Sequence, residues 1–234
     1  MDNVRAVERA LELLECFSDE RKNIGLSELS RMLVLPKATV LRLARTLENK
    51  GYLIQDAERQ YYRLGPRVLA LGQVFLADLE YRQVALPFME ELRNRTQESV
   101  SLYAVSGGER VCVQRVESPH ALRQVINIGA RLPLKRGSAG KLLVVFQNLP
   151  GYDEDITQEE RKQMLETGYA HSFEEREQGL ASISVPIRNN KGYVIASLTL
   201  SGPSFRFTID NNHKYVDEMM RTAKQISYQL GYLE

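Results

Sequence analysis

The sequence lacks tryptophan, has only two cysteines and contains no long apolar run. Its longest uninterrupted apolar stretch, Leu142 to Phe146, has five residues, whereas a membrane-spanning helix needs about 20. The first fifteen residues carry charges where a secretion signal has its apolar stretch, so we expect a cytoplasmic protein with no membrane partner. Cys16 and Cys112 have neither metal-binding nor redox spacing, which predicts buried, reduced thiols.

Length and charge narrow the class of protein. A chain of 234 residues allows one large domain or two smaller ones, and 43% hydrophobic residues indicate a globular core. The net charge is only +1, but residues 31–50 hold five basic side chains against one acidic, after an acidic excess in residues 1–30. A compact basic patch favours binding to nucleic-acid phosphates, whereas the acidic block at residues 152–177 is expected to be a solvated surface.

The spacing of apolar residues predicts helices in the N-terminal segment. Apolar residues at steps of three and four predict a first helix that packs inward through Val4, Val7, Leu11, Leu14 and Phe17. Ser27 is expected to be the N-cap of a short second helix. The chain then breaks before Pro36, where a third helix is expected to begin and to run to the turn at Gly51. Two short helices joined by a tight turn indicate a helix-turn-helix, and the strand-like residues 52–55 and 61–64 predict a β-hairpin wing behind it.

The third helix has the two faces that a DNA-recognition helix requires. Val40, Leu43 and Leu47 would fix it on the domain, while short polar and basic side chains on another face would enter the major groove. We expect Thr39 and Arg42 to contact base edges or nearby phosphates, and the remaining residues to contact phosphates or position the helix. The predicted DNA-contacting residues are Ser27, Lys37, Thr39, Arg42, Arg45, Thr46 and the wing-tip residue Arg59.

The second half of the chain alternates between helices and short strands. Residues 66–80 are typical of an apolar linker helix, residues 84–98 of an amphipathic helix, and residues 211–231 of a final helix. Strands are expected at residues 100–105, 110–116, 125–128, 181–186 and 193–200. This pattern predicts an α+β fold with an antiparallel sheet. The expected domains are a winged helix-turn-helix at 1–65, a linker helix at 66–80 and a second domain at 81–234.

A polar cavity is expected in the second domain. Gly137 to Lys141 leads from a loop into the apolar helix Leu142 to Phe146, so free N–H groups at the helix start could hold the carboxylate of an anionic metabolite. The segment is not a Walker A loop, because Lys135 stands where glycine is required and no Ser or Thr follows Lys141. Hydroxyl side chains alternate on two neighbouring strands and would reach one cavity from Ser182, Ser184, Thr199 and Ser201.

A resemblance to a known family covers nearly the whole chain in order. Two segments, LSELSRMLVLPKATVLRLARTLENKGYL and YYRLGPRVLALG, resemble the DNA-binding domain and linker of the IclR family of bacterial transcription regulators. The likeness continues through INIGARLPLKRGSAGKLL, GYAHSFEEREQGLASISVPIRN and SLTLSGP. Arg188 departs from the family signature, which usually has an aromatic residue or histidine there. In the third helix, Ala44 and Arg45 replace the bulkier apolar and small residues that are expected in the family. This difference affects which operator sequence the helix would recognise.

The resemblance implies a GAF-like effector-binding domain, double-stranded operator DNA as a partner, an organic or aromatic acid as the effector, and a homodimer or homotetramer. Ser138, Ser182, Thr199 and Ser201 match positions that line the family's effector pocket, with Leu122 beside Ala121 on an apolar wall. No cofactor is implied. The predicted effector-binding residues are Leu122, Gly129, Ser138, Ala139, Gly140, Ser182, Ser184, Thr199 and Ser201.

Two other classes of function compete with a regulator. A hydrolase built on Ser138 and Lys141 would need a base with an orienting partner, and none is evident, so we do not expect an enzyme. His120, His171 and His213 lack paired ligand spacing, so we expect no metal site. A protein-only interaction module would have no salt-dependent affinity for DNA, and the basic third helix argues against it.

Overall fold

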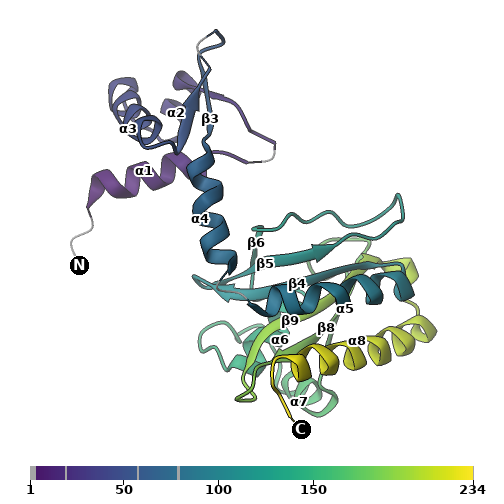
Figure 1. The fold of residues 1–234 in the computed structure, drawn as a ribbon. Helices are drawn as coiled ribbons and strands as arrows, with labels where there is room; N and C mark the ends of the chain where they lie inside the picture. Colours follow the sequence, from purple (N-terminus) through teal and green to yellow (C-terminus); the bar gives the residue numbers. More distant parts are fainter. Residues whose placement is uncertain (1–3, 19, 57, 78–79, 234) are drawn as a thin grey trace. The chain divides into compact units, whose positions relative to one another are not determined.

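The computed structural model describes residues 4–18, 20–56, 58–77 and 80–233, and its helices and strands are drawn in Figure 1. The chain divides after residue 78 into two compact units, which we call unit 1 and unit 2. None of the helices in the described residues combines the length and apolarity that crossing a bilayer requires.

Unit 1 combines helices with a three-stranded antiparallel sheet of order β1-β3-β2. Its elements are α1 (Arg5–Glu15), β1 (Ile24–Gly25), α2 (Leu26–Met32), α3 (Lys37–Asn49), β2 (Leu53–Gln55), β3 (Tyr61–Leu64) and α4 (Pro66–Ala77). Buried side chains from the first three helices and all three strands form its core: Leu13, Ile24, Leu29, Val40, Ala44, Leu53 and Tyr62. The predicted helix-turn-helix (α2 and α3) and wing (β2 and β3) are confirmed.

The first helix differs from the prediction in the face that it buries. Val4, Val7 and Leu11 are 66%, 55% and 54% exposed, so the prediction that they pack inward is wrong for the single chain. Leu13 is the buried residue of α1, and Leu14 and Phe17 are only partly buried against the core. Helical spacing identified an apolar stripe, but the unit 1 core contacts only one edge of it.

The start of α2 also differs from the prediction. Ser27 is not the N-cap, because β1 pairs with β3 as far as Gly25 and the helix begins directly at Leu26. In the turn before α3, Val34 adopts a left-handed conformation with a φ of 52°. Pro36 is the N-cap of α3 rather than its first residue, and the chain breaks where the proline predicted it.

Unit 2 is built on a six-stranded antiparallel sheet of order β6-β5-β4-β9-β8-β7. Its elements are α5 (Glu80–Thr96), β4 (Ser99–Ser106), β5 (Glu109–Val116), β6 (Arg131–Pro133), α6 (Ser138–Gln147), α7 (Gln158–Thr167), β7 (Ala170–Phe173), β8 (Leu180–Arg188), β9 (Val194–Pro203), the short 3-10 helix η1 (Ser204–Arg206) and α8 (Ile209–Gln229). Helices α5 and α8 cover one face of the sheet, and α6 packs on β8 and β9 from the other. The predicted α+β fold with an antiparallel sheet is confirmed.

The two faces of the unit 2 sheet differ in polarity. On β8 and β9, apolar side chains such as Ile183 and Leu198 belong to the core under α5 and α8. Their sequence neighbours are hydroxyl residues on the opposite face, and they are buried or half-buried beneath α6: Ser182, Ser184, Ser197, Thr199 and Ser201. Because strand side chains alternate between faces, the alternation predicted from the sequence brings these hydroxyls together.

Several boundaries after β3 differ from the prediction. Residues 125–128 form an irregular loop rather than a strand, and the strand that pairs with β5 on this side is β6, further along the chain. Helix α4 ends at Ala77, residues 78–79 lie outside the described residues, and α5 begins at Glu80 rather than at residue 84. Helix α6 begins at Ser138 rather than Leu142, so most of the predicted loop Gly137 to Lys141 is its first turn.

Both cysteines are free and buried, as predicted. Burial raises the pKa of the Cys112 thiol to about 11. The unfolded chain loses this proton near the ordinary value of 9.0. The contribution of the protonated Cys112 thiol to the free energy of unfolding is therefore complete below about pH 9 and is lost as the pH rises toward 11. We expect neither thiol of the folded protein to react with an aromatic disulfide reagent at about pH 7.5, and both to react on unfolding. Rapid reaction of one thiol in the folded protein would contradict this prediction.

Candidate functional site

The exposed face of α3 gathers basic side chains of unit 1. Val40 and Ala44 are fully buried and hold the helix on the core. Exposed positions on α3 carry four of the predicted DNA-contacting residues, Lys37, Arg42, Arg45 and Thr46. Arg42 lies three positions before Arg45 and four before Thr46, so these side chains share one surface of the helix. The arrangement presents three cations and a hydroxyl toward solvent.

The other predicted DNA-contacting residues lie at three separate places in unit 1. Thr39 is half-buried on α3, Ser27 is exposed on α2, and Arg59 is exposed at the wing tip. The Asp56 carboxylate accepts the backbone N–H of Arg59 at 2.8 Å, and this bond holds the pKa of Asp56 below its usual value while it shapes the turn. The Thr46 hydroxyl donates to the Arg42 carbonyl at 2.9 Å, which leaves only its oxygen to accept from a partner. DNA contact by these residues stays a prediction.

A chain of hydroxyl groups links α6 to the sheet of unit 2. The Ser138 hydroxyl lies 2.7 Å from the hydroxyls of both Ser182 and Ser184. The Ser184 hydroxyl continues to Thr199 at 2.9 Å, and Thr199 to Ser197 at 3.2 Å. Ser138, Ser184 and Ser197 are completely buried. The cluster fixes the first turn of α6 over the polar face of β8 and β9, because buried hydroxyls need such partners.

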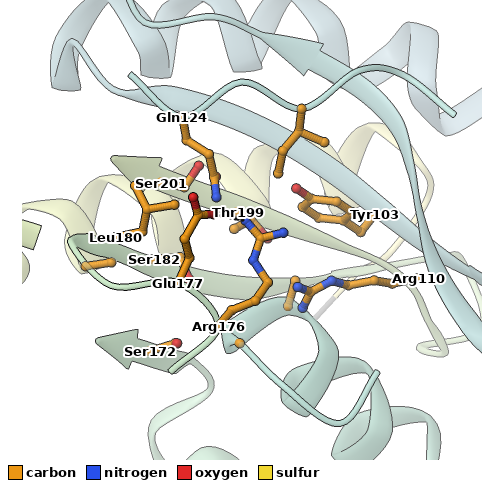
Figure 2. A pocket seen from close by; sticks show the side chains of 14 residues that line it. Tyr103, Arg110, Gln124, Ser172, Arg176, Glu177, Leu180, Ser182, Thr199 and Ser201 are labelled. Atoms are coloured by element: carbon orange, nitrogen blue, oxygen red, sulfur yellow. Dashed lines mark hydrogen bonds and ion pairs between the residues drawn. The ribbon is translucent and has the colours of Figure 1, made fainter. Parts of the chain in front are cut away.

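A cavity lies between this first turn, the polar sheet face and two loops (Figure 2). We call it the effector cavity, because it lies where the sequence predicts effector binding. Its lining residues are Tyr103, Arg110, Gln124, Ile126, Gly137, Ala139, Ser172, Arg176, Glu177, Leu180, Ala181, Ser182, Thr199 and Ser201. Its free volume is about 30 Å³, enough for one or two water molecules but far below the several hundred Å³ of a small-molecule site. An organic ligand therefore requires the cavity to open.

The structure brings most of the predicted effector-binding residues to this cavity. Ala139, Ser182, Thr199 and Ser201 line it directly. Ser138 and Ser184 lie one layer behind through the hydroxyl chain, and Gly140 follows Ala139 in the first turn of α6. Leu122 is 62% exposed and lies outside the lining, as does Gly129, whose N–H donates to the Cys112 carbonyl.

Several lining residues were not predicted from the sequence. Figure 2 shows Tyr103 and Arg110 reaching the cavity from β4 and β5, Gln124 from the loop after β5, and Arg176 and Glu177 from the loop after β7. Arg110 is 4% exposed, and burial lowers the pKa of its guanidinium to about 10. The signal for Arg110 was its strand position two residues before Cys112, a residue already expected to be buried.

The loop of residues 174–179 covers one side of the effector cavity, and we call it the gate loop. Glu174 at its start has a left-handed φ of 55° and accepts a hydrogen bond from the Ser204 hydroxyl at 2.7 Å. Glu175 forms an ion pair with Lys141 of α6 at 2.9 Å. Two contacts therefore tie the gate loop to η1 and to α6, and these must adjust when the cavity opens.

Weakening the Lys141–Glu175 pair is expected to loosen the gate loop. In Glu175→Gln, Lys141 keeps its second carboxylate, Glu160, at 2.9 Å, so no buried charge loses its only partner. A pair of this partial exposure is worth about 1 kcal/mol, so amide hydrogen exchange in residues 174–179 should rise about fivefold. Glu166→Gln, which removes the exposed partner of Lys162, should leave this exchange unchanged. Equal exchange in Glu175→Gln and the wild-type protein would contradict the role of the pair.

The hydrolase alternative does not fit the geometry of Ser138 and Lys141. Burial alone would lower the pKa of Lys141, but Glu160 and Glu175 outweigh it and the pKa is raised, so the amine stays protonated and cannot act as a base. The Ser138 hydroxyl bonds to two other serine hydroxyls rather than to a base. Neither residue is activated for nucleophilic catalysis.

Comparison with known families decides the identity. Residues 6–57 match the IclR helix-turn-helix domain, and residues 73–165 and 152–228 match the bacterial transcriptional regulator IclR C-terminal domain. The chain belongs to the IclR family. It is a DNA-binding transcriptional regulator and not an enzyme, and the C-terminal match contains the effector cavity. The family resemblance stated from the sequence is confirmed.

Individual IclR-family relatives cover the whole length of the chain. The regulator KdgR of Dickeya chrysanthemi is 32% identical over 99% of this chain and 81% of its own length. The regulator XynR of Escherichia coli K12 is 29% identical over 99% of both chains. Among solved structures, an IclR homologue of Microbacterium hydrocarbonoxydans in complex with 4-hydroxybenzoate matches with a TM-score of 0.83, at 25% identity over 96% of this chain and 98% of that one.

Proposed function

We propose that this IclR-family regulator acts in the bacterial cytoplasm as a homodimer or homotetramer. In this proposal α3 and the wing read double-stranded operator DNA, and a small anionic metabolite in the effector cavity changes operator affinity. The corresponding organisation is a DNA-binding domain at residues 1–65, a linker helix at 66–80 and an effector-binding domain at 81–234. The division of the chain after residue 78 and the two separate family matches support this organisation.

Operator reading is supported by the exposed cationic face of α3. Arg42 and Arg45 are exposed, while Val40 and Ala44 fix the helix from behind. An arginine on a helix in the major groove binds a guanine edge through two hydrogen bonds, whereas Lys37 and the wing-tip Arg59 suit phosphates. Three or four such contacts from one chain give modest affinity, so two copies on two half-sites would raise both affinity and specificity.

Self-association is supported by apolar side chains that unit 1 leaves exposed. These are Val4 just before α1, Val7 and Leu11 on α1, and Leu69, Leu71 and Val74 on α4, all at least 54% exposed. Two adjacent elements with such side chains favour burial against another protein surface. A second copy of the same chain fits the symmetry of paired operator half-sites.

Effector control is supported by the effector cavity itself. Its walls combine hydroxyl groups, a buried arginine and the first turn of α6, which are groups that bind anions. The free volume of about 30 Å³ is smaller than an organic acid, so occupancy must stabilise a more open state, and a ligand that binds one state better shifts the population toward it. The homologue solved with 4-hydroxybenzoate shows that a protein of this fold holds an aromatic acid.

The experiment that tests the proposal is selection of genomic fragments on the full-length protein at physiological salt. We expect enrichment of a short, roughly palindromic sequence, bound by a dimer or tetramer in sedimentation analysis. Affinity for that fragment is then measured with a panel of organic and aromatic acids, and at least one acid should change it. A folded protein that enriches no sequence, with or without the panel, would contradict the proposal.

A further inference from the structure

We propose that Arg110 is the residue that binds the effector's carboxylate, and that the charge around it selects an acid with one carboxylate over an acid with two. This inference deepens the proposed effector control and rests on it. It assigns a role to a residue of β5 that neither the helix-turn-helix nor the predicted effector-binding set contains.

The first observation is that Arg110 is a buried cation without a counterion. Its side chain is 4% exposed, and no carboxylate of the described residues lies within ion-pair distance of it. Its Nη1 donates to the Arg136 carbonyl at 3.0 Å, and its guanidinium stacks on the Tyr103 ring at 5.4 Å. Its Nε is buried and has no hydrogen-bond partner among the residues that the structure describes. A buried guanidinium without a counterion destabilises the folded protein unless a bound anion pairs with it.

The second observation is that Arg110 lies against the positive end of α6. A side chain added at Gly137 or Gly140 would come within 3.2 Å or 3.0 Å of the guanidinium, so this backbone approaches it closely. The N-cap residue Gly137 provides no side-chain cap, and the first-turn N–H groups carry the positive end of the helix dipole. Two positive groups side by side repel each other, and an anion bound next to both would offset this repulsion.

A third observation, independent of the first two, lies on the opposite wall. The Ser201 hydroxyl is buried, lines the same cavity and has no hydrogen-bond partner in the described part of the chain. Buried hydroxyls usually find a partner, so Ser201 and the neighbouring Thr199 and Ser182 are placed to bind hydroxyl groups of a ligand. A ligand with a polar group beside its carboxylate would give Ser201 the hydrogen-bond partner that it lacks.

The charge inside the cavity indicates how many carboxylates the ligand has. Arg176 and Glu177 both line the cavity and lie 3.5 Å apart, so their charges largely offset each other. Arg110 remains as the one uncompensated cation among the lining residues described. A single carboxylate neutralises it, whereas a second would face Glu177. A monocarboxylate is therefore preferred over a dicarboxylate of the same size.

Binding to the full-length protein tests the inference with matched ligands. The probes are glycolate, lactate, D-gluconate and 4-hydroxybenzoate, each compared with its uncharged amide, and tartrate as the dicarboxylate. We expect at least one hydroxylated monocarboxylate to bind about tenfold or more tightly than its amide and than tartrate, as a charge-assisted hydrogen bond implies. If every carboxylate binds no better than its amide, or none binds at all, the inference is overturned.

Substitutions then assign the preference to Arg110. Arg110→Gln should remove the advantage of the acid over its amide, Arg110→Lys should keep part of it, and Ser201→Ala should weaken acid and amide alike. Arg131→Gln, an exposed arginine on the neighbouring strand paired with Glu109 at 2.6 Å, is the matched control and should change nothing. An undiminished acid preference in Arg110→Gln overturns the inference.

Two further readouts separate the possible failures. If Arg110→Gln does not fold, the Nε–H resonance of Arg110 in the wild-type protein is followed by NMR, and it should shift on addition of the bound acid. An unchanged resonance overturns the inference. Fragment selection is repeated on every variant. A variant that loses the acid preference but still selects the operator has a defect in the cavity alone. Failure of the wild-type protein to select an operator contradicts the proposed function itself.

Discussion

Replacing Arg42 with alanine is expected to weaken binding to the selected operator by about 1–3 kcal/mol per half-site and to reduce discrimination against mismatched sites. Arg42 is exposed on α3 and belongs to the same surface as Arg45 and Thr46. An arginine in this position donates two hydrogen bonds to one base edge, and alanine removes both without disturbing the buried face of the helix. The affinity is measured on the operator and on fragments with single base changes.

Two comparisons interpret the result for Arg42. Lys37→Ala at the start of α3 should weaken binding to every sequence by a similar factor and reduce its salt dependence, because a phosphate contact carries no base information. Arg131→Ala in unit 2 should leave DNA binding unchanged. If Arg42→Ala lowers affinity equally on all sequences, Arg42 is a phosphate contact, and if it has no effect, the assigned face of α3 is wrong.

The largest expected effect on stability is that of Glu98→Ala in unit 2, about 3–5 kcal/mol. Glu98 is 1% exposed and binds Arg206 of η1 through both carboxylate oxygens, one of them at 2.8 Å. This pairing raises the pKa of Arg206. Arg206 also donates to the Leu122 carbonyl at 3.1 Å, so it joins η1 to the residue that precedes β4 and to the loop that carries Gln124 into the effector cavity.

The consequence of Glu98→Ala is measured by thermal unfolding and by acid binding. Unit 2 should unfold at a temperature lower by on the order of 10 °C, and acid affinity should fall because the Gln124 loop loses its support. Glu109→Ala breaks an exposed pair with Arg131 and should cost at most about 1 kcal/mol. Similar losses in the two variants would show that burial of the Glu98–Arg206 pair does not have the assigned effect.

The sequence predicted those features that depend on local spacing. Ser182 and Ser184 on β8, and Thr199 and Ser201 on β9, alternate with apolar residues, and a period of two suffices to place them on one sheet face. The turn before α3 follows from Pro36 in the same local way. These elements needed no knowledge of distant contacts.

Features that depend on long-range contacts were missed. Its spacing from Cys112 indicates that Arg110 is buried, but spacing does not reveal its contacts with Tyr103 and with the carbonyl of Arg136, 26 residues away. The segment 125–128 has strand-like composition, but it is irregular, and Arg131–Pro133 pairs with β5 in its place. The exposed stripe of α1 looks inward-facing because helical spacing identifies an apolar face and not the surface that covers it.

The most direct test of the account is the affinity of the full-length protein for its selected operator as an acid fills the effector cavity. The account predicts that the acid that binds best alters the operator dissociation constant by about 5- to 150-fold at saturation. In Arg110→Gln the same acid concentration should leave operator affinity unchanged. An operator affinity that stays constant while the wild-type cavity becomes saturated with acid would contradict control by the effector cavity.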